Sequence, residues 1–302
     1  MLKNLKGNFI LFIAALIWGT CFVAQSEGMD FVEPFTYNAT RTLIGGLTLL
    51  PVIFCFKFLG KKKETREKLN IKVSLIGGVF CGLALCVASS LQQIGIVYTT
   101  AGKSGFITAL YVIIVPLFQL VCGKNQPKRI WICVALAILG FYLLCIKGDF
   151  TVSVGDLLTL GCACVFAVHI TVIDRFLKKG ADGMIMSCVQ FWVAGLIMLI
   201  PMFMFETPSI EGIYNARYTI LYAGVLSSGI AYTLQIIGQR FTAPTTATLI
   251  MSLESVFAAL SGWLILGEQL SFKEFFGCAL VFIAVIVAQI EIPKLKRKST
   301  LE

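Results

Sequence analysis

Residues 231–253 of the chain read AYTLQIIGQRFTAPTTATLIMSL, and residues 88–110 read ASSLQQIGIVYTTAGKSGFITAL. The two stretches align without a gap at a constant offset of 143 positions, and they share L-Q-x-I-G followed by an aromatic residue and a threonine. A weaker match joins residues 7–26 to residues 155–174. The pattern predicts that the chain consists of two related halves.

The composition is typical of a protein that lies within a membrane. Of the 302 residues, 58% are hydrophobic and only 14% are charged, whereas about 25% of the residues of soluble domains are charged. Because a spanning helix needs about 20 apolar residues, windows of that length locate the candidate spans. We predict ten of them, over residues 8–26, 35–57, 73–94, 101–122, 129–146, 155–173, 185–205, 218–238, 243–266 and 275–291.

Five spans in each half is an odd number, so the second half is expected to enter the membrane from the other side. Two inverted halves that meet at the membrane midplane are the plan of many secondary transporters. The sequence therefore predicts an all-α polytopic membrane protein with ten transmembrane helices in two inverted five-helix repeats. We expect the first repeat over residues 1–147, the second over residues 148–293, and a basic cytoplasmic tail over residues 294–302.

The basic residues predict the orientation, because cytoplasmic loops are enriched in lysine and arginine. With a cytoplasmic N-terminus, 20 of the 25 lysines and arginines fall on the cytoplasmic side, 4 fall outside, and Arg41 lies within a span. Both termini are therefore expected in the cytoplasm of a cell with this protein in its plasma membrane. The basic loop KFLGKKKETREK, residues 57–68, is expected to contact anionic lipid headgroups rather than nucleic acid.

Three stretches resemble the EamA-type members of the drug/metabolite transporter superfamily. They are AALIWGTCFVAQS (residues 14–26), EPFTYNATRTLIGGL (residues 33–47) and LIMSLESVFAALSGWLILGEQLSFKEFFGCALVFIAVIVA (residues 249–288). The resemblance implies ten helices, inverted repeats, and export or exchange of small organic solutes. Members of this family usually have proline after the glutamate, and this chain has Ser255 instead. Because of this departure, we expect the ninth span to be less kinked here than in the family.

Two ionisable side chains, Arg41 and Glu254, lie well inside predicted spans, where a charge costs about 2.5–3.5 kcal/mol on insertion scales. On a helical wheel, small residues share the face of Glu254, which would leave space to bind a cation, an amine or a proton. The alternative is a buried glutamate that caps a helix or pairs with arginine. Arg41 could attract a carboxylate or phosphate of the solute, or it could have a structural role.

Uncharged polar residues in the spans complete the candidate site, because a glutamine facing lipid would leave its amide unpaired. Such residues could bind a polar solute or join helices by hydrogen bonds. Tyr111 is included as the repeat partner of Glu254, whereas His169 is expected to have a structural role near the membrane interface. The further candidates are Gln92, Gln93, Tyr232 and Gln235 for solute binding, and Trp18, Asn38 and Trp192 as pocket wall or gate.

These features favour a secondary transporter that moves a small organic solute, such as an amino acid or another metabolite, by alternating access. The alternatives are a polytopic membrane enzyme and a membrane scaffold or receptor. The chain has a single histidine and no H-E-x-x-H motif or P-loop, which argues against metal-dependent catalysis and direct ATP drive. The 11 cysteines are expected to pack as small apolar residues. We expect no cofactor or metal, and the sequence leaves proton coupling and homodimer formation open.

Overall fold

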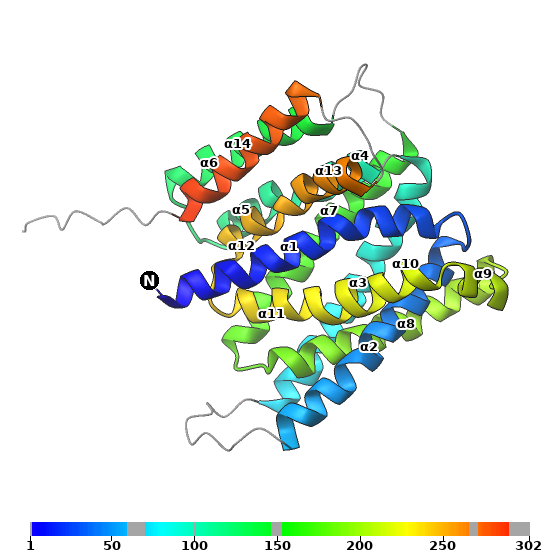
Figure 1. The fold of residues 1–302 in the computed structure, drawn as a ribbon. Coiled ribbons are helices and arrows are strands. Elements are labelled where there is room, and N and C mark those ends of the chain that lie inside the picture. Colours follow the sequence, from blue (N-terminus) through cyan, green and yellow to red (C-terminus); the bar gives the residue numbers. More distant parts are fainter. Residues whose placement is uncertain (1, 59–69, 100, 146–152, 266–270, 290–302) are drawn as a thin grey trace, which may run out of the picture.

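A computed structural model describes residues 2–58, 70–99, 101–145, 153–265 and 271–289, and Figure 1 shows these residues as a bundle of helices without strands. The basic loop and the C-terminal tail predicted from the sequence lie largely outside the described residues. The helices are α1 (Leu2–Gly28), α2 (Pro34–Phe58), α3 (Ile71–Tyr98), α4 (Ala101–Thr108), α5 (Tyr111–Val121), α6 (Lys128–Cys145), α7 (Val154–Lys178), α8 (Gly183–Phe205), α9 (Ile210–Asn215), α10 (Arg217–Leu221), the π-helix η1 (Tyr222–Ala231), α11 (Tyr232–Gln239), α12 (Pro244–Met251), α13 (Leu253–Ile265) and α14 (Phe272–Gln289).

Seven segments of the described chain are long and apolar enough to cross a membrane. They include three segments made of consecutive helices, namely α4 with α5, α10 with η1 and α11, and α12 with α13. The multi-pass membrane architecture expected from composition is thus confirmed. The remaining predicted spans coincide with α2, α6 and α14, and the total of ten stays a prediction.

The two halves run in opposite directions through the bundle. Helices α3 and α7 are antiparallel, because the Thr99 hydroxyl after α3 donates to Asp156 at the start of α7 at 2.8 Å, while Asn70 before α3 donates to the carbonyl of Gly180 after α7 at 2.9 Å. Helix α1 begins beside the end of α11, where Gly7 lies against Gly238. We call the end of the bundle that carries the start of α1 and the turn after α7 the terminal face, and the other end the opposite face (Figure 1).

The two repeats make equivalent glycine contacts, one at each face of the bundle. At the terminal face, a Cβ added to Gly7 would lie 3.0 Å from the carbonyl oxygen of Gly238. At the opposite face, a Cβ added to Gly155 would lie 2.6 Å from the carbonyl oxygen of Gly95. Gly155 and Gly95 are the repeat counterparts of Gly7 and Gly238 in the sequence alignment. Glycine is needed here because each contact brings two helix backbones together, so the same helix crossing occurs at both faces.

Two spans are interrupted at equivalent positions. Helix α4 ends at Thr108 and α5 begins at Tyr111, while α12 ends at Met251 and α13 begins at Leu253. The interruptions at Ala109 and Ser252 are 143 positions apart, which is the repeat offset. The ninth span is interrupted although Ser255 replaces the proline of the family pattern, and a smaller kink than in other members stays a prediction. Discontinuous helices of this kind form the solute sites of many transporters.

Candidate functional site

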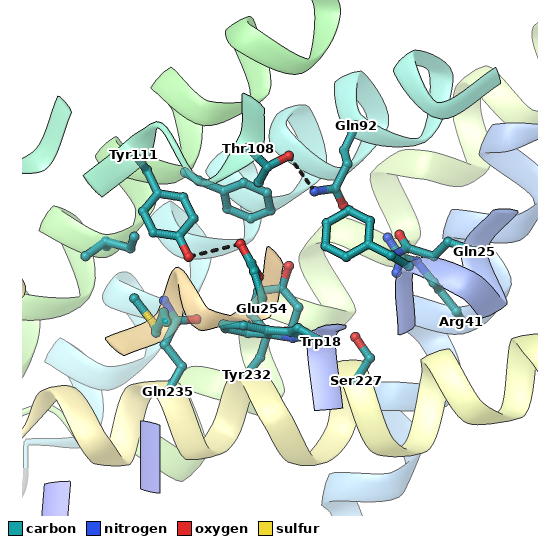
Figure 2. Close-up of a pocket in the computed structure, with 14 residues that line it drawn as sticks. Trp18, Gln25, Arg41, Gln92, Thr108, Tyr111, Ser227, Tyr232, Gln235 and Glu254 are labelled. Atoms are coloured by element: carbon teal, nitrogen blue, oxygen red, sulfur yellow. Dashed lines mark hydrogen bonds between the residues drawn. The ribbon is translucent and has the colours of Figure 1, made fainter. Parts of the chain in front are cut away.

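A small cavity lies between the two repeats, beside both interrupted spans (Figure 2). The space open to the centre of a water molecule is ≈ 40 Å³. We call it the central cavity. It is lined by Trp18, Phe22, Gln25, Arg41, Gln92, Thr108, Tyr111, Phe166, Ile170, Ser227, Tyr232, Gln235, Met251 and Glu254.

Much of the lining consists of equivalent residues from the two repeats. Three pairs differ by the offset of 143, and two more differ by the offset of 148 that relates the first spans. The cavity is therefore built around the pseudo-twofold axis that relates the repeats. The pairs are Gln92 with Gln235, Thr108 with Met251, Tyr111 with Glu254, Trp18 with Phe166, and Phe22 with Ile170.

One of these pairs is joined directly. The Tyr111 hydroxyl at the start of α5 donates a hydrogen bond to Oε1 of Glu254, in the first turn of α13, at 3.0 Å. Two residues exchanged by a twofold operation can touch only close to the axis, so this contact places the carboxylate at the centre of the bundle. Glu254 is only 5% exposed, and it is the one carboxylate among the lining residues. The buried tyrosine thus helps to satisfy a carboxylate that cannot reach bulk water.

Arg41 contributes the opposite charge from α2. Its Nε donates to Oδ1 of Asn38 at 2.8 Å, and Nδ2 of Asn38 donates to the carbonyl oxygen of Ser89 at 2.9 Å. Asn38 is therefore fixed by α3 and in turn holds the guanidinium at the cavity. Both Arg41 and Glu254 line the cavity, yet no ion pair within 4.0 Å joins these two described residues. The cavity consequently presents a cation and a carboxylate as separate groups.

Three further polar atoms at the cavity lack hydrogen-bond partners in the described structure. They are the indole Nε1 of Trp18 and the amide oxygens of Gln25 and Gln235. An unpaired buried polar group costs about 1–3 kcal/mol by mutational data, so these atoms are suited to water or a polar solute. One donor and two acceptors, together with Arg41 and Glu254, could bind a small molecule with groups of both charges.

The structure brings together seven of the ten predicted site residues. Asn38, Gln93 and Trp192 are the exceptions, because they do not line the central cavity in this structure. Asn38 lies behind Arg41, whereas Nε2 of Gln93 turns to the carbonyl oxygen of Gln25 at 3.3 Å. Trp192 packs on α2 at Gly46, where an added Cβ would lie 3.2 Å from its Nε1. The seven that line the cavity are Trp18, Arg41, Gln92, Tyr111, Tyr232, Gln235 and Glu254.

Several lining residues were missed, and the repeat itself carries the signal that could have found some of them. Phe166 and Ile170 are the counterparts of Trp18 and Phe22, although they are apolar and attract no attention in a span. Ser227 lines the cavity from the π-helix η1, where the register differs from that of an α-helix.

His169 is not near the membrane interface, and that part of its prediction is wrong. The side chain is fully buried, and its Nε2 lies 3.0 Å from Oε1 of Gln190. The ring centroid lies 6.1 Å from that of Tyr232 in an edge-on arrangement. His169 thus packs behind the wall of the central cavity.

Asn38→Leu is expected to weaken solute binding, because the guanidinium of Arg41 loses the acceptor that positions it. A hydrogen bond to a charged group is worth about 1.5–3 kcal/mol, so the solute concentration for half-maximal flux should rise about tenfold or more. Gln93→Leu is the matched control, since Gln93 is equally buried but bonds only to backbone. Equal kinetics in the two variants would show that Asn38 does not position Arg41.

The same fold and family are found in known proteins. A solved crystal structure superposes with a TM-score of 0.77 over 94% of this chain and 96% of its own chain, at 17% sequence identity, which shows the fold alone. A protein of Archaeoglobus fulgidus described as an uncharacterized transporter is 30% identical over 293 residues, covering 96% of this chain and 88% of the relative.

Two bacterial relatives are similar over nearly the full length. The uncharacterized transporter YoaV of Bacillus subtilis is 25% identical, covering 88% of this chain and 90% of its own. The uncharacterized inner membrane transporter YedA of Escherichia coli is 24% identical, covering 92% and 88%. The model of the EamA-like transporter family matches twice, over residues 5–146 and 153–289. With both repeats matched, the chain belongs to the EamA-like transporter family.

Proposed function

We propose that this membrane transporter moves a small organic solute with both an anionic and a cationic group, such as an amino acid, by alternating access. The observation that carries the proposal is the pair of separate charges in the central cavity. Arg41 is suited to a carboxylate of the solute, and Glu254 to its ammonium group. A solute with both groups would also satisfy the unpaired indole and amide atoms nearby.

The size of the cavity is consistent with a contracted state between two open ones. A space of ≈ 40 Å³ is far below the roughly 300–1,000 Å³ of a usual ligand pocket, so the cavity must widen when the solute binds. The glycine contacts at Gly7 and Gly155 bring two helices together in equivalent ways, one at each face. In an inverted repeat, opening one crossing while the other stays closed would give the two states that alternating access requires.

A counterflow assay in proteoliposomes tests the proposal. Vesicles loaded with an unlabelled mixture of amino acids should accumulate labelled zwitterions from outside, whereas monocarboxylates and monoamines of similar size should exchange at least tenfold more slowly. The variant Arg41→Gln is measured beside the wild-type protein, and it should reduce zwitterion exchange to the level of protein-free vesicles. If Arg41→Gln and the wild-type chain exchanged every class equally well, the proposed use of the two charges would be wrong.

The proposed location is the plasma membrane, with the terminal face in the cytoplasm. Cysteines placed at Asp30 and Glu211 should react with an impermeant thiol reagent in intact cells, since both lie at the opposite face. A cysteine at Lys179, in the turn after α7, should react only after the cells are opened. The background needs Cys122→Ser and Cys164→Ser, because these native cysteines are exposed. Labelling of Lys179→Cys in intact cells would reverse the orientation.

A further inference from the structure

A second cavity opens at the terminal face, between the turn after α7 and the turn that joins α11 to α12. Its volume is ≈ 600 Å³, and its lining includes Lys178, Gln239, Arg240 and Pro244. We call it the terminal vestibule. We propose that the terminal vestibule is a binding site, separate from the central cavity, for an oxyanion such as a carboxylate or phosphate that has a hydrogen-bond donor next to it.

Gln239 is the first observation that points to a ligand. Its side chain is 4% exposed, and neither Nε2 nor Oε1 has a hydrogen-bond partner in the described structure. Rotating the amide by 180°, which swaps Nε2 and Oε1, would not give either atom a hydrogen-bond partner, because both positions lack one. Gln25 and Gln235 differ, since each has only one buried atom without a partner. A buried amide with both ends unpaired is costly, and a ligand that accepts from Nε2 and donates to Oε1 would remove that cost.

The start of α12 is the second observation. The N-cap residue Ala243 provides no side-chain hydrogen bond, and Pro244 occupies the first turn. The first backbone bond of the helix runs from Ala247 to Ala243 at 2.8 Å, so no side chain of the described structure caps the amide groups that precede it. The N-terminus of a helix favours an anion through these amide groups and the helix dipole. Pro244, the last residue of the lining, has no N–H group, so the start of α12 favours an anion in the cavity through the helix dipole, and Nε2 of Gln239 is the neighbouring hydrogen-bond donor.

The charges around the vestibule favour the same ligand. Asp174 also lines it, but its carboxylate is paired with Lys178 at 2.5 Å. Arg240 adds an exposed positive charge at the rim, and Lys6 of α1 lies 5.8 Å from the ring centroid of Phe241 in the same turn. The lining is thus net positive, as an oxyanion site requires.

The other repeat provides an internal comparison. An equivalent cavity of ≈ 460 Å³ lies at the opposite face, between the turn after α1 and the end of α3. There Ile96 replaces Gln239, Val97 replaces Arg240 and Asp30 replaces Lys178. The tendency of cytoplasmic loops to be basic accounts for the lysine and the arginine, but it does not account for a buried glutamine. A buried glutamine is therefore specific to the terminal vestibule, whereas the cavity at the opposite face has the acidic residues Asp30 and Glu33 in its lining.

Binding of inorganic phosphate to the full chain tests the proposal without any transport measurement. The chain is placed in nanodiscs of phosphatidylcholine, and the thermal unfolding midpoint is followed as phosphate replaces chloride at constant ionic strength. A ligand that binds the native state raises the midpoint in a saturable way. Gln239→Ile, which copies the residue of the other vestibule, should raise the half-saturating phosphate concentration at least tenfold. The control Gln93→Leu should leave it unchanged, because Gln93 lines neither cavity.

A second variant keeps the test decisive if Gln239→Ile does not fold. Gln239→Glu preserves the side-chain size and is tolerated next to a helix N-terminus, but its charge repels phosphate, so the saturable rise should disappear. The proposal is overturned if the wild-type midpoint does not respond to phosphate, or if Gln239→Ile simply stabilises the protein and leaves the response intact.

Nanodiscs that contain phosphatidylglycerol distinguish two possible origins of the bound oxyanion, a lipid headgroup and a free anion in solution. If a lipid headgroup occupies the vestibule, the midpoint of the wild-type chain is already raised in these discs and phosphate adds nothing further. If the ligand is a free oxyanion, phosphate gives the same saturable rise in both kinds of disc. Both results support the oxyanion site, provided that Gln239→Ile removes the effect.

Discussion

Glu254→Gln is expected to abolish the pH dependence of solute exchange and to lower its rate at least tenfold, while the yield of folded protein stays unchanged. Glu254 is the one carboxylate at the central cavity, so it is the lining group whose charge can respond to a proton or an ammonium group there. Glutamine has the same shape and still accepts the hydrogen bond from Tyr111, but it carries no charge at any pH. The measurement is counterflow in proteoliposomes over a range of pH.

Tyr111→Phe is the matched control for Glu254→Gln. It removes the hydroxyl that donates to Glu254 at 3.0 Å and leaves the carboxylate in place. Exchange by Tyr111→Phe should therefore keep a pH dependence, although the profile is displaced. If Glu254→Gln retained the wild-type pH profile, the carboxylate would have a structural role, and the solute would be recognised by Arg41 and the uncharged groups alone.

Gly19→Ala is expected to destabilise the protein by about 1–3 kcal/mol, the usual cost of overpacking a well-packed contact. An added Cβ would lie 2.3 Å from Cβ of Phe257 and 2.7 Å from the carbonyl oxygen of Glu254. Backbone atoms of α13 cannot move aside without separating the helix from α1. Because this contact fixes the segment that carries Glu254, exchange activity should fall together with the midpoint of thermal unfolding.

Gly105→Ala provides the comparison, since the nearest atom to an added Cβ there is Cε2 of Phe22 at 3.8 Å. Gly105 lies inside α4, where alanine is favoured over glycine by about 0.5–1 kcal/mol. We therefore expect its unfolding midpoint to stay the same or rise. Equal midpoints for Gly19→Ala and Gly105→Ala would contradict the close contact between α1 and α13.

The architecture could be predicted from sequence because two signals are long and redundant. Hydropathy marks each span over about 20 residues, and the gapless offset of 143 relates whole segments rather than single positions. The same offset relates Tyr111 to Glu254, and both residues line the central cavity. Polar residues within spans were found for a similar reason, since lipid does not tolerate unpaired amides.

The errors arose where the backbone departs from a continuous α-helix. The helical wheel drawn around Glu254 assumed 100° per residue through Ser252, where the span is in fact interrupted. The π-helix η1 also departs from α-helical register, and Ser227 within it lines the cavity although it was not predicted. Such breaks depend on contacts between distant segments, which a single-span pattern does not contain.

Asn38 shows a different limit of the sequence. A polar residue in a span indicates an interior position, but it does not say whether the side chain reaches the solute or holds a neighbour. Asn38 lies one helical turn before Arg41 and bonds to both Arg41 and α3. Asn38 holds Arg41 rather than facing the solute because the carbonyl oxygen of Ser89 in α3 lies within hydrogen-bond distance of its Nδ2. That distance depends on how the helices pack.

The contact between Tyr111 and Glu254 bears on why both repeats belong to a single polypeptide. In an assembly of two identical five-helix chains, a position on the dyad would face its own copy. Two carboxylates so close would oppose each other's ionisation, while two tyrosines would supply no charge. Joining the copies end to end lets the two positions diverge, so that one acid is balanced by one phenol. A lone ionisable group at the symmetry centre is thus a property that gene fusion makes attainable and that a symmetric pair of subunits cannot have.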